Sequence, residues 1–266
     1  MDLELSGKTA LVTGGSRGIG KAVARQLGLE GVDVAIAARD QATLEAAAGE
    51  LRGETGRKIV PIVADTTDEQ SIKRMVSQTV DALGRLDILV NCAAKAGGYA
   101  PPPKLGEITE EAFWDDMNTK VLGYLRCAQA AAPHMIQQGW GRIICISGLA
   151  ARSTGSTIGS IRNVAVVAMA KNLADELGPQ GVTVNVVHPG LTRTERTAGL
   201  VDSRASQEGI SPEEVERRMA NGNSVKRLID ARDIAYVVAF LASPKSIAIN
   251  GDVIAAGGGA PGPIFY

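Results

Sequence analysis

The sequence of 266 residues lacks the features of several protein classes. Its three cysteines, Cys92, Cys127 and Cys145, form no CxxC pair, which excludes a disulfide framework, and no metal site is expected. The 28 basic residues nearly balance the 29 acidic ones, so the chain has no positive charge excess that would favour binding to nucleic acid. The longest wholly apolar run, Val164–Ala170, is too short to cross a bilayer, and the start, MDLELSG, lacks an apolar signal region. We therefore expect a cytoplasmic protein that binds neither nucleic acid nor membrane.

Apolar segments of strand length alternate with segments of helical length along the whole chain. Because each apolar run is continuous, both faces of the predicted sheet are covered, as in parallel sheets. The alternation is typical of βαβ units. We predict one α/β domain over 1–266, a Rossmann-like, doubly wound parallel sheet of seven strands with helices on both faces. The predicted strands are Lys8–Thr13, Asp33–Ala38, Lys58–Ala64, Leu86–Asn91, Arg142–Ser147, Val182–Val187 and Asp252–Ala256, and the predicted helices are Gly20–Leu29, Ala42–Arg52, Glu69–Leu83, Glu110–Gln137, Val164–Leu177 and Ala231–Ala242.

Two segments interrupt this alternation. Gly97–Lys104 is a turn-rich loop after the fourth strand, and Leu191–Lys226 is a polar insertion with a predicted short helix at Pro212–Ala220. Ligands of doubly wound sheets bind beyond the carboxyl ends of the strands, where both segments emerge. We interpret the insertion at 191–226 as a lid, and an inert surface excursion is the alternative.

The segment Thr13–Gly20 (TGGSRGIG) follows the first strand directly and opens the first helix. Gly14 allows a sharp turn, Gly18 allows the backbone to approach a pyrophosphate, and Gly20 lets the helix pack closely on the sheet. The free N–H groups at the helix start then face the anion. This strand–turn–helix context predicts a dinucleotide site, with a purely structural turn as the alternative.

The end of the second strand indicates which dinucleotide binds. Proteins that select NAD place a carboxylate there for the ribose 2′-hydroxyl. Here Arg39 follows the strand, no carboxylate precedes Asp40, and Arg17 lies in the glycine turn. Guanidinium groups favour a 2′-phosphate, so NADP(H) is predicted over NAD(H). The alternative is that Arg39 is only a solvated residue at a helix start.

These residues resemble those of the short-chain dehydrogenase/reductase family, and the likeness covers nearly the whole chain. TGGSRGIG matches the family's TGxxxGIG turn, Asn91-Cys92-Ala93-Ala94 resembles its NNAG motif, and Pro189-Gly190 with Thr194 matches its PGxxxT segment. Asp65, after the third strand, matches the family's adenine-contacting Asp. The resemblance implies that the cofactor is bound by Gly14, Ser16, Arg17, Gly18, Ile19, Gly20, Arg39, Asp65, Asn91, Ala93, Pro189, Gly190 and Thr194.

The family's catalytic set of Asn, Ser, Tyr and Lys has no evident counterpart. No Tyr occurs between Tyr124 and Tyr236, so the YxxxK motif is absent from its usual region. Alignment without a gap back from Pro189-Gly190 places the family Tyr on Gly159 and its Lys on Asn163, whereas alignment from the fifth strand gives Ile161 and Ala165. The family Ser falls on Gly148, next to Ser147, and the family Asn falls on Lys120 rather than Asn118.

Two residues are the candidate catalysts in this altered setting. A buried Lys120 would have a lowered pKa and would donate a proton near neutral pH, and Ser147 would hydrogen-bond a substrate carbonyl. Further donors are Tyr99, His188 and the hydroxyl-rich stretch at 153–160. Each has a structural alternative: Lys120 would fill the vacated space, and Ser147 would cap the strand end. For His188, we favour a packing role over catalysis.

Three functions follow from these observations. The first is an NADP(H)-dependent oxidoreductase acting on a small carbonyl or secondary alcohol substrate with a degenerate or relocated catalytic set. The second is a non-catalytic NADP(H)-binding regulator or inactive partner, and the third is another enzyme class on the same fold, such as a lyase or isomerase. The family resemblance also implies a homo-oligomer, a tetramer or dimer. The terminal segment ending at Tyr266 would then contact a neighbouring subunit, and disorder of this segment is the alternative.

Overall fold

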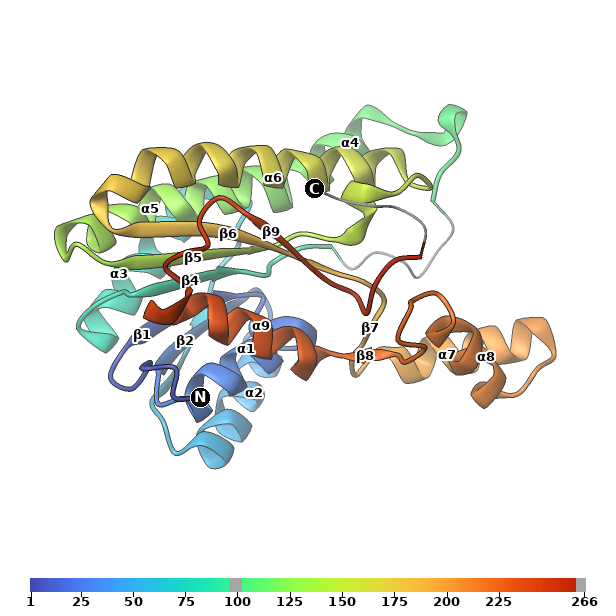
Figure 1. Cartoon of the computed structure of the whole chain (residues 1–266), viewed down its shortest axis with the longest axis horizontal. Coiled ribbons are helices and arrows are strands. Elements are labelled where there is room, and N and C mark those ends of the chain that lie inside the picture. Colours follow the sequence, from blue (N-terminus) through green and yellow to red (C-terminus); the bar gives the residue numbers. More distant parts are fainter. Residues whose placement is uncertain (96–101, 262–266) are drawn as a thin grey trace.

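The computed structural model describes residues 1–95 and 102–261. Its central layer is a sheet of seven parallel strands in the order β3-β2-β1-β4-β5-β6-β9 (Figure 1). This arrangement confirms the predicted doubly wound sheet, and each predicted strand corresponds to an observed one. The strands are β1 (Thr9–Thr13), β2 (Asp33–Ala38), β3 (Ile59–Val63), β4 (Ile88–Asn91), β5 (Gly141–Ile146), β6 (Val182–Pro189) and β9 (Val253–Ala256).

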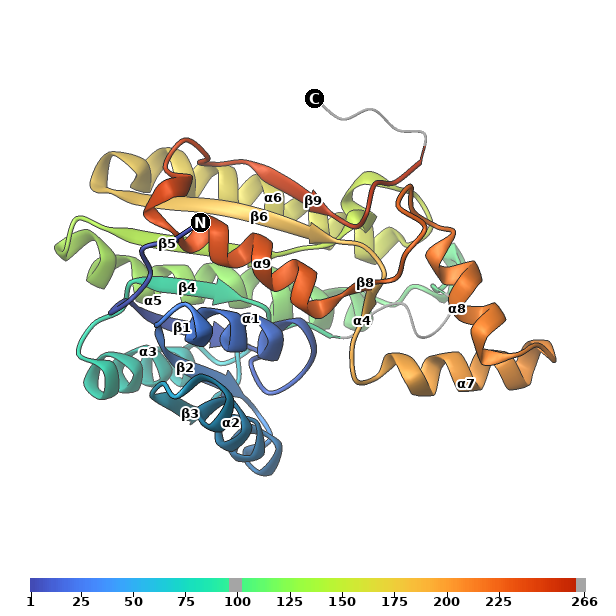
Figure 2. The ribbon, with the colours of Figure 1, turned by 60° about the horizontal axis from the view of Figure 1, so that its bottom comes forward.

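Helices cover both faces of the sheet, and each face has its own apolar core. One core is formed with α1, α2 and α9, and the other with α3, α5 and α6 (Figure 2). The continuous apolar runs of the strands are explained by this double coverage. The helices that flank the sheet are α1 (Gly18–Leu29), α2 (Gln41–Thr55), α3 (Glu69–Leu83), α5 (Gly123–Gln137), α6 (Thr157–Leu177) and α9 (Ala231–Ala242). Helix α4 (Glu110–Met117) precedes α5 and buries none of its residues.

Two helices differ from their predicted form. Helix α6 begins at Thr157 instead of Val164, because the Ser156 hydroxyl caps its start by accepting a hydrogen bond from Gly159 N at 3.1 Å. The predicted helix Glu110–Gln137 is interrupted between α4 and α5 by a π-helical turn at Asn118–Leu122. Such turns widen a helix locally, and they often occur at functional sites.

The insertion at 191–226 contains β7 (Thr192–Arg193), α7 (Thr197–Glu208) and α8 (Pro212–Ala220), and α8 confirms the predicted short helix. Strand β7 pairs in parallel with β8 (Ile229–Asp230), and α7 and α8 share a small apolar core of their own. Both helices extend to one side of the sheet, beyond the end of β6 (Figure 1). A single domain with a lid stays a prediction.

Among the described residues, no helix is both long and apolar enough to cross a membrane. Part of the predicted loop Gly97–Lys104, including Tyr99, lies outside the described residues, as does the terminal segment at 262–266.

Candidate active site

The glycine turn between β1 and α1 has the backbone that the sequence predicts. Gly14 and Gly18 have φ values of +67° and +57°, in the left-handed region that favours glycine. A Cβ on Gly20 would lie 2.2 Å from the carbonyl oxygen of Gly14, so the first turn of α1 packs directly on the loop. Helix α1 has no side-chain cap of its own, and Gly18 N donates instead to a carboxylate oxygen of Glu195 at 2.9 Å. The turn therefore already holds an anionic group.

The carboxyl end of β4 lies directly against this turn. Thr13 Oγ1 accepts hydrogen bonds from Cys92 N at 3.1 Å and Ala93 N at 3.2 Å, which ties the two strand ends together. Asn91 is fully buried, and its Nδ2 donates to Cys145 Sγ at 3.7 Å. Its Oδ1 is a buried acceptor without a hydrogen-bond partner in the part of the chain that the structure describes. A bound group with a donor would satisfy this oxygen.

Two charged residues, Arg39 and Asp40, follow the end of β2. Arg39 is exposed, and Asp40 caps α2 by accepting from Thr43 N at 2.9 Å. The Thr43 hydroxyl and amide, with a smaller contribution from the charge of Arg17, hold the pKa of the Asp40 carboxyl below its usual value. The Asp40 carboxylate is thus engaged in the cap. After β3, Asp65 Oδ1 accepts from Thr67 N at 2.9 Å.

The segment after β6 brings the remaining predicted cofactor residues to the same edge. Pro189 ends β6, and a Cβ on Gly190 would lie 3.0 Å from Gly257 Cα, so the two glycines pack closely. The Thr194 methyl group lies 3.6 Å from where a Cβ on Gly18 would be. Ser16 is buried within the turn, and Ile19 packs against the core that includes α1. These residues fit a dinucleotide, since the turn offers N–H groups to a pyrophosphate and Asn91 offers an acceptor.

A second cluster surrounds Lys120, which lies in the π-helical turn and is only 3% exposed. Lys120 Nζ donates to the carbonyl oxygen of Ser147 and to Asn163 Oδ1, both at 3.0 Å. The Ser147 hydroxyl lies 3.1 Å from the main-chain oxygen of Asn163 and 3.3 Å from its Oδ1. The structure thus places both predicted catalytic residues in one buried network with Asn163.

Burial lowers the pKa of Lys120 to about 7, because desolvation penalises the ammonium form. The positive charge of Arg162 lowers it further, while the carboxylate of Asp116 raises it. An amine with such a pKa exists in both protonation states near neutral pH, which is what proton transfer requires.

His188 is held at the end of β6 by burial and by one hydrogen bond, and the packing role that we favour from the sequence stays a prediction. Its Nδ1 accepts a hydrogen bond from Gly148 N at 3.2 Å, and its imidazole is almost completely buried. Burial, followed by the charges of Arg152 and Lys120, lowers the pKa of His188 to about 4. The ring is therefore neutral at pH 7 and fixes the loop after β5.

Helix α6 carries the two positions, 159 and 163, where the sequence resemblance places the family's Tyr and Lys. Gly159 and Asn163 lie one helical turn apart on the buried side of α6, whereas Ile161 is 43% exposed. Asn163, from the gapless alignment, therefore lies on the side of α6 that contacts Lys120. A Cβ on Gly159 would lie 2.7 Å from Ser156 Oγ, so the helix cap occupies the space beside this glycine. Ser153 and Thr154 of the hydroxyl-rich stretch are exposed.

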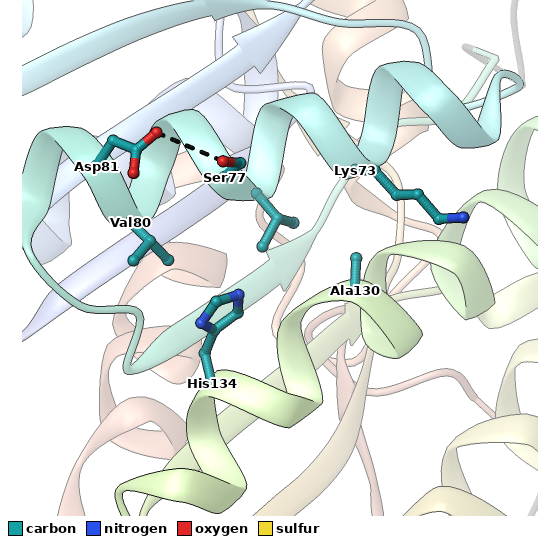
Figure 3. Close-up of a pocket in the computed structure, with 7 residues that line it drawn as sticks. Lys73, Ser77, Val80, Asp81, Ala130 and His134 are labelled. Atoms are coloured by element: carbon teal, nitrogen blue, oxygen red, sulfur yellow. Dashed lines mark hydrogen bonds between the residues drawn. The ribbon is translucent and has the colours of Figure 1, made fainter.

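A groove of about 290 Å³ lies elsewhere, between α3 and α5 (Figure 3). Its lining residues are Lys73, Val76, Ser77, Val80, Asp81, Ala130 and His134. None of them is a predicted cofactor or catalytic residue, so the candidate site is the edge formed by the strand ends.

Comparison with known proteins decides the family. The family model described as enoyl-(acyl carrier protein) reductase matches residues 14–260. The chain belongs to the short-chain dehydrogenase/reductase family. It is 34% identical over 253 residues to the short-chain reductase protein NovJ of Streptomyces niveus, covering 95% of this chain and 93% of that protein. It is also 34% identical over 255 residues to the 3-oxoacyl-[acyl-carrier-protein] reductase FabG of Staphylococcus aureus, covering 95% and 97%.

Solved structures of this family agree with the fold. L-sorbose reductase from Gluconobacter frateurii, solved with NADPH and L-sorbose, superposes with a TM-score of 0.92 at 25% identity, covering 99% of this chain and all of that one. YwfH, an NADPH-dependent reductase involved in bacilysin biosynthesis, gives 0.86 at 28% identity, covering 97% and 99%. Membership of the family makes the chain an oxidoreductase with an NAD(P)-binding Rossmann fold.

Sequence reasoning missed three features of the site. It assigned no role to Glu195, whose contact with Gly18 joins residues far apart in the chain. It named Asn163 only as a replaced position, and it did not foresee the pairing of Arg162 with Asp116 across α6 and α4. The one available signal was the alignment, which places Lys120 at the position of the family's Asn and Asn163 at the position of the family's Lys.

Proposed function

We propose that the chain is an NADP(H)-dependent oxidoreductase that interconverts a carbonyl compound and a secondary alcohol, with Lys120 as the group that exchanges the proton. The observation that carries this proposal is the buried Lys120 amine at the carboxyl ends of β4 and β5. The relatives support it, because several are reductases by name, one similar structure is described as a complex with NADPH, and another is described as an NADPH-dependent reductase.

Lys120 has the hydrogen-bonding capacity for this step. An ammonium group carries three N–H donors, and two of them are used by Ser147 O and Asn163 Oδ1. The third donor is left for a substrate carbonyl oxygen. Bound NADPH would supply the hydride to the carbonyl carbon. In reduction, the ammonium gives its proton to the oxygen, which becomes the hydroxyl, and the neutral amine then takes a proton from solvent.

The Ser147 hydroxyl faces Asn163 in this arrangement. Its single hydrogen is donated within the network, so we assign Ser147 to positioning Asn163 and retain Lys120 as the group that contacts substrate. The glycine turn and the residues at the strand ends would hold the cofactor, with Arg17 and Arg39 selecting its 2′-phosphate.

The test measures cofactor binding and turnover separately. NADPH binding is followed by its fluorescence, and oxidation of NADPH is assayed with a panel of ketones and aldehydes. Lys120→Met removes the amine but keeps the length and apolar stem of the side chain. We expect the variant to bind NADPH like the parent and to lose about 10²–10⁴-fold in turnover. Unchanged turnover in Lys120→Met would disprove the assignment of Lys120.

The second candidate function is a non-catalytic NADP(H)-binding protein. Glycines at 148 and 159, where the family has Ser and Tyr, favour it. Binding of NADPH without oxidation by any member of the panel would support this alternative. The expected surroundings are the reduced cytoplasm, because Cys92, Cys127 and Cys145 are all free thiols.

A further inference from the structure

The side-chain amide of Asn163 is the most constrained polar group around Lys120. Its Oδ1 accepts from Lys120 Nζ at 3.0 Å and lies 3.3 Å from Ser147 Oγ, whose single hydrogen is shared between this oxygen and the main-chain oxygen of Asn163. Its Nδ2 lies 3.1 Å from where a Cβ on Gly148 would be. The amide is therefore wedged between the lysine on one side and the loop after β5 on the other.

Both oxygens that contact the Lys120 amine belong to uncharged groups. A carbonyl oxygen stabilises an ammonium without neutralising it, whereas a carboxylate would hold the proton far more tightly. The carboxylate that acts on Lys120 is Asp116, which is already bound by Arg162 through both oxygens. Two neutral acceptors thus orient the amine and leave its proton available.

We propose that Asn163 is the positioning residue for Lys120, and that the pair is a reciprocal exchange in which an ammonium and a carboxamide have traded helices. This inference rests on the proposed function of Lys120. It assigns to the Asn163 amide the role of setting how tightly the Lys120 amine holds its proton. Lys120 lies in the π-helical turn and Asn163 on α6, and the two side chains meet in the buried space between these elements.

The first test changes only the charge of the acceptor. Asn163→Asp places a carboxylate 3.0 Å from the amine, so the pKa of Lys120 rises and the fall of reduction rate with pH moves upward by at least one unit. Asn163→Leu removes the acceptor and moves the fall downward. Asn172→Asp adds the same charge at an exposed position of α6 and is expected to leave the pH dependence of the reduction rate unchanged. The other titratable or charged groups around Lys120 are the same in all variants: Asp116 on α4, Tyr124 on α5, Arg162 on α6, Cys92 after β4, Cys145 on β5 and His188 on β6.

The second test does not depend on turnover. Thermal unfolding is compared for Lys120→Asn, Asn163→Lys and the double exchange. Asn163→Lys alone buries two like charges and should unfold at the lowest temperature, whereas the double exchange restores one ammonium and one amide and recovers most of the loss. Additive effects of the two substitutions contradict the exchange. If the double exchange restores stability but the parent protein oxidises no NADPH, the exchange stands and only the proposed function is contradicted.

A separate observation concerns Glu195. Its carboxylate accepts from Gly18 N at 2.9 Å, at the start of an α1 helix that has no side-chain cap and no acidic residue in its first turn. The Thr194 methyl group lies close to the same glycine. A carboxylate and a phosphate compete for the same N–H groups at a helix start.

The geometry points to Glu195 as an internal competitor that occupies the pyrophosphate position and must be displaced when the cofactor binds. Glu195→Ala is expected to bind NADPH about two- to fivefold more tightly than the parent, and Glu195→Gln, which loses only the charge, falls between them. Glu208→Ala removes a carboxylate elsewhere on the insertion and serves as the control.

A second ligand tests whether Glu195 acts on the pyrophosphate part of the cofactor. Adenosine 2′-monophosphate lacks the pyrophosphate and should bind the parent and Glu195→Ala equally. Equal or weaker NADPH binding by Glu195→Ala contradicts the competition and makes Glu195 a simple helix cap. Failure of both proteins to bind NADPH contradicts the proposed cofactor as well, so the two failures are distinguishable.

Discussion

Arg162 and Asp116 form a bidentate ion pair that joins α6 to α4, with Nη1 at 2.6 and 2.7 Å from the two carboxylate oxygens. Both side chains are largely buried, at 13% and 14% exposure. The pair lies next to the Lys120 network, since both charges act on the pKa of Lys120. It therefore ties α6, which carries Asn163, to the helix that leads into the π-helical turn of Lys120.

Asp116→Asn is expected to lower the free energy of unfolding by about 3 kcal/mol, because it leaves a buried guanidinium without its counter-charge. Urea unfolding measures the change. Asp175→Asn removes an exposed partner of Lys171 on the same helix, and it should cost no more than about 0.5 kcal/mol. Equal losses in the two variants would show that the Arg162–Asp116 pair behaves as a surface pair.

The buried amine makes folding stability depend on pH. The pKa of Lys120 is about 7 in the folded chain and 10.5 as its ordinary value, so the unfolded chain binds more protons between these values. Stability attributable to Lys120 therefore rises with pH from about 7 to 10.5. Lys120→Met abolishes this dependence. The free energy of unfolding of the variant minus that of the parent, measured in urea, should therefore be larger at pH 7 than at pH 9.5. Lys171→Met, at an exposed position, should show no such trend.

Cofactor selection is expected to change with one residue. Arg39→Asp places a carboxylate at the end of β2, which suits a ribose 2′-hydroxyl and repels a 2′-phosphate. The ratio of NADPH to NADH affinity should fall by at least about tenfold. Fluorescence titration with both coenzymes measures it, and Arg74→Asp on the exposed side of α3 is the control. An unaltered ratio would mean that Arg39 is only a solvated residue.

Assembly is expected to use the apolar outer side of α6 and the neighbouring π-helical turn. Val164, Ile161 and Leu122 are 50%, 43% and 37% exposed there, which is more apolar surface than a helix facing water usually carries. We propose a homodimer or tetramer through this face. Val164→Asp should lower the mass measured by analytical ultracentrifugation, whereas Val225→Asp, in the insertion, should not. A monomeric parent protein would contradict this proposal.

The sequence was sufficient for the fold because its signals are local. Each buried strand is a continuous apolar run, and the glycine turn is encoded by residues adjacent in the chain, as the φ values of Gly14 and Gly18 confirm. The start of α6 was placed too late because Thr157, Ile158 and Gly159 are poor helix formers, and the cap supplied by Ser156 outweighs them.

The site was less predictable because its contacts join distant segments. Lys120 meets Ser147 and Asn163 only after three elements pack together, and no local pattern reports that geometry. Glu195 reaches the glycine turn across most of the chain. A resemblance identifies which residue types are replaced, but it does not show which new side chains occupy the space.

The central claim is that a buried lysine exchanges the proton of this reaction, and direct titration of that amine tests it most sharply. The protein is labelled with ¹³C at the lysine ε-carbons, and the Lys120 signal, assigned by its loss in Lys120→Met, is followed with pH. The account predicts a midpoint near 7 that coincides with the fall of reduction rate as pH rises. A signal that titrates near the usual 10.5, or a rate profile indifferent to that midpoint, would contradict it.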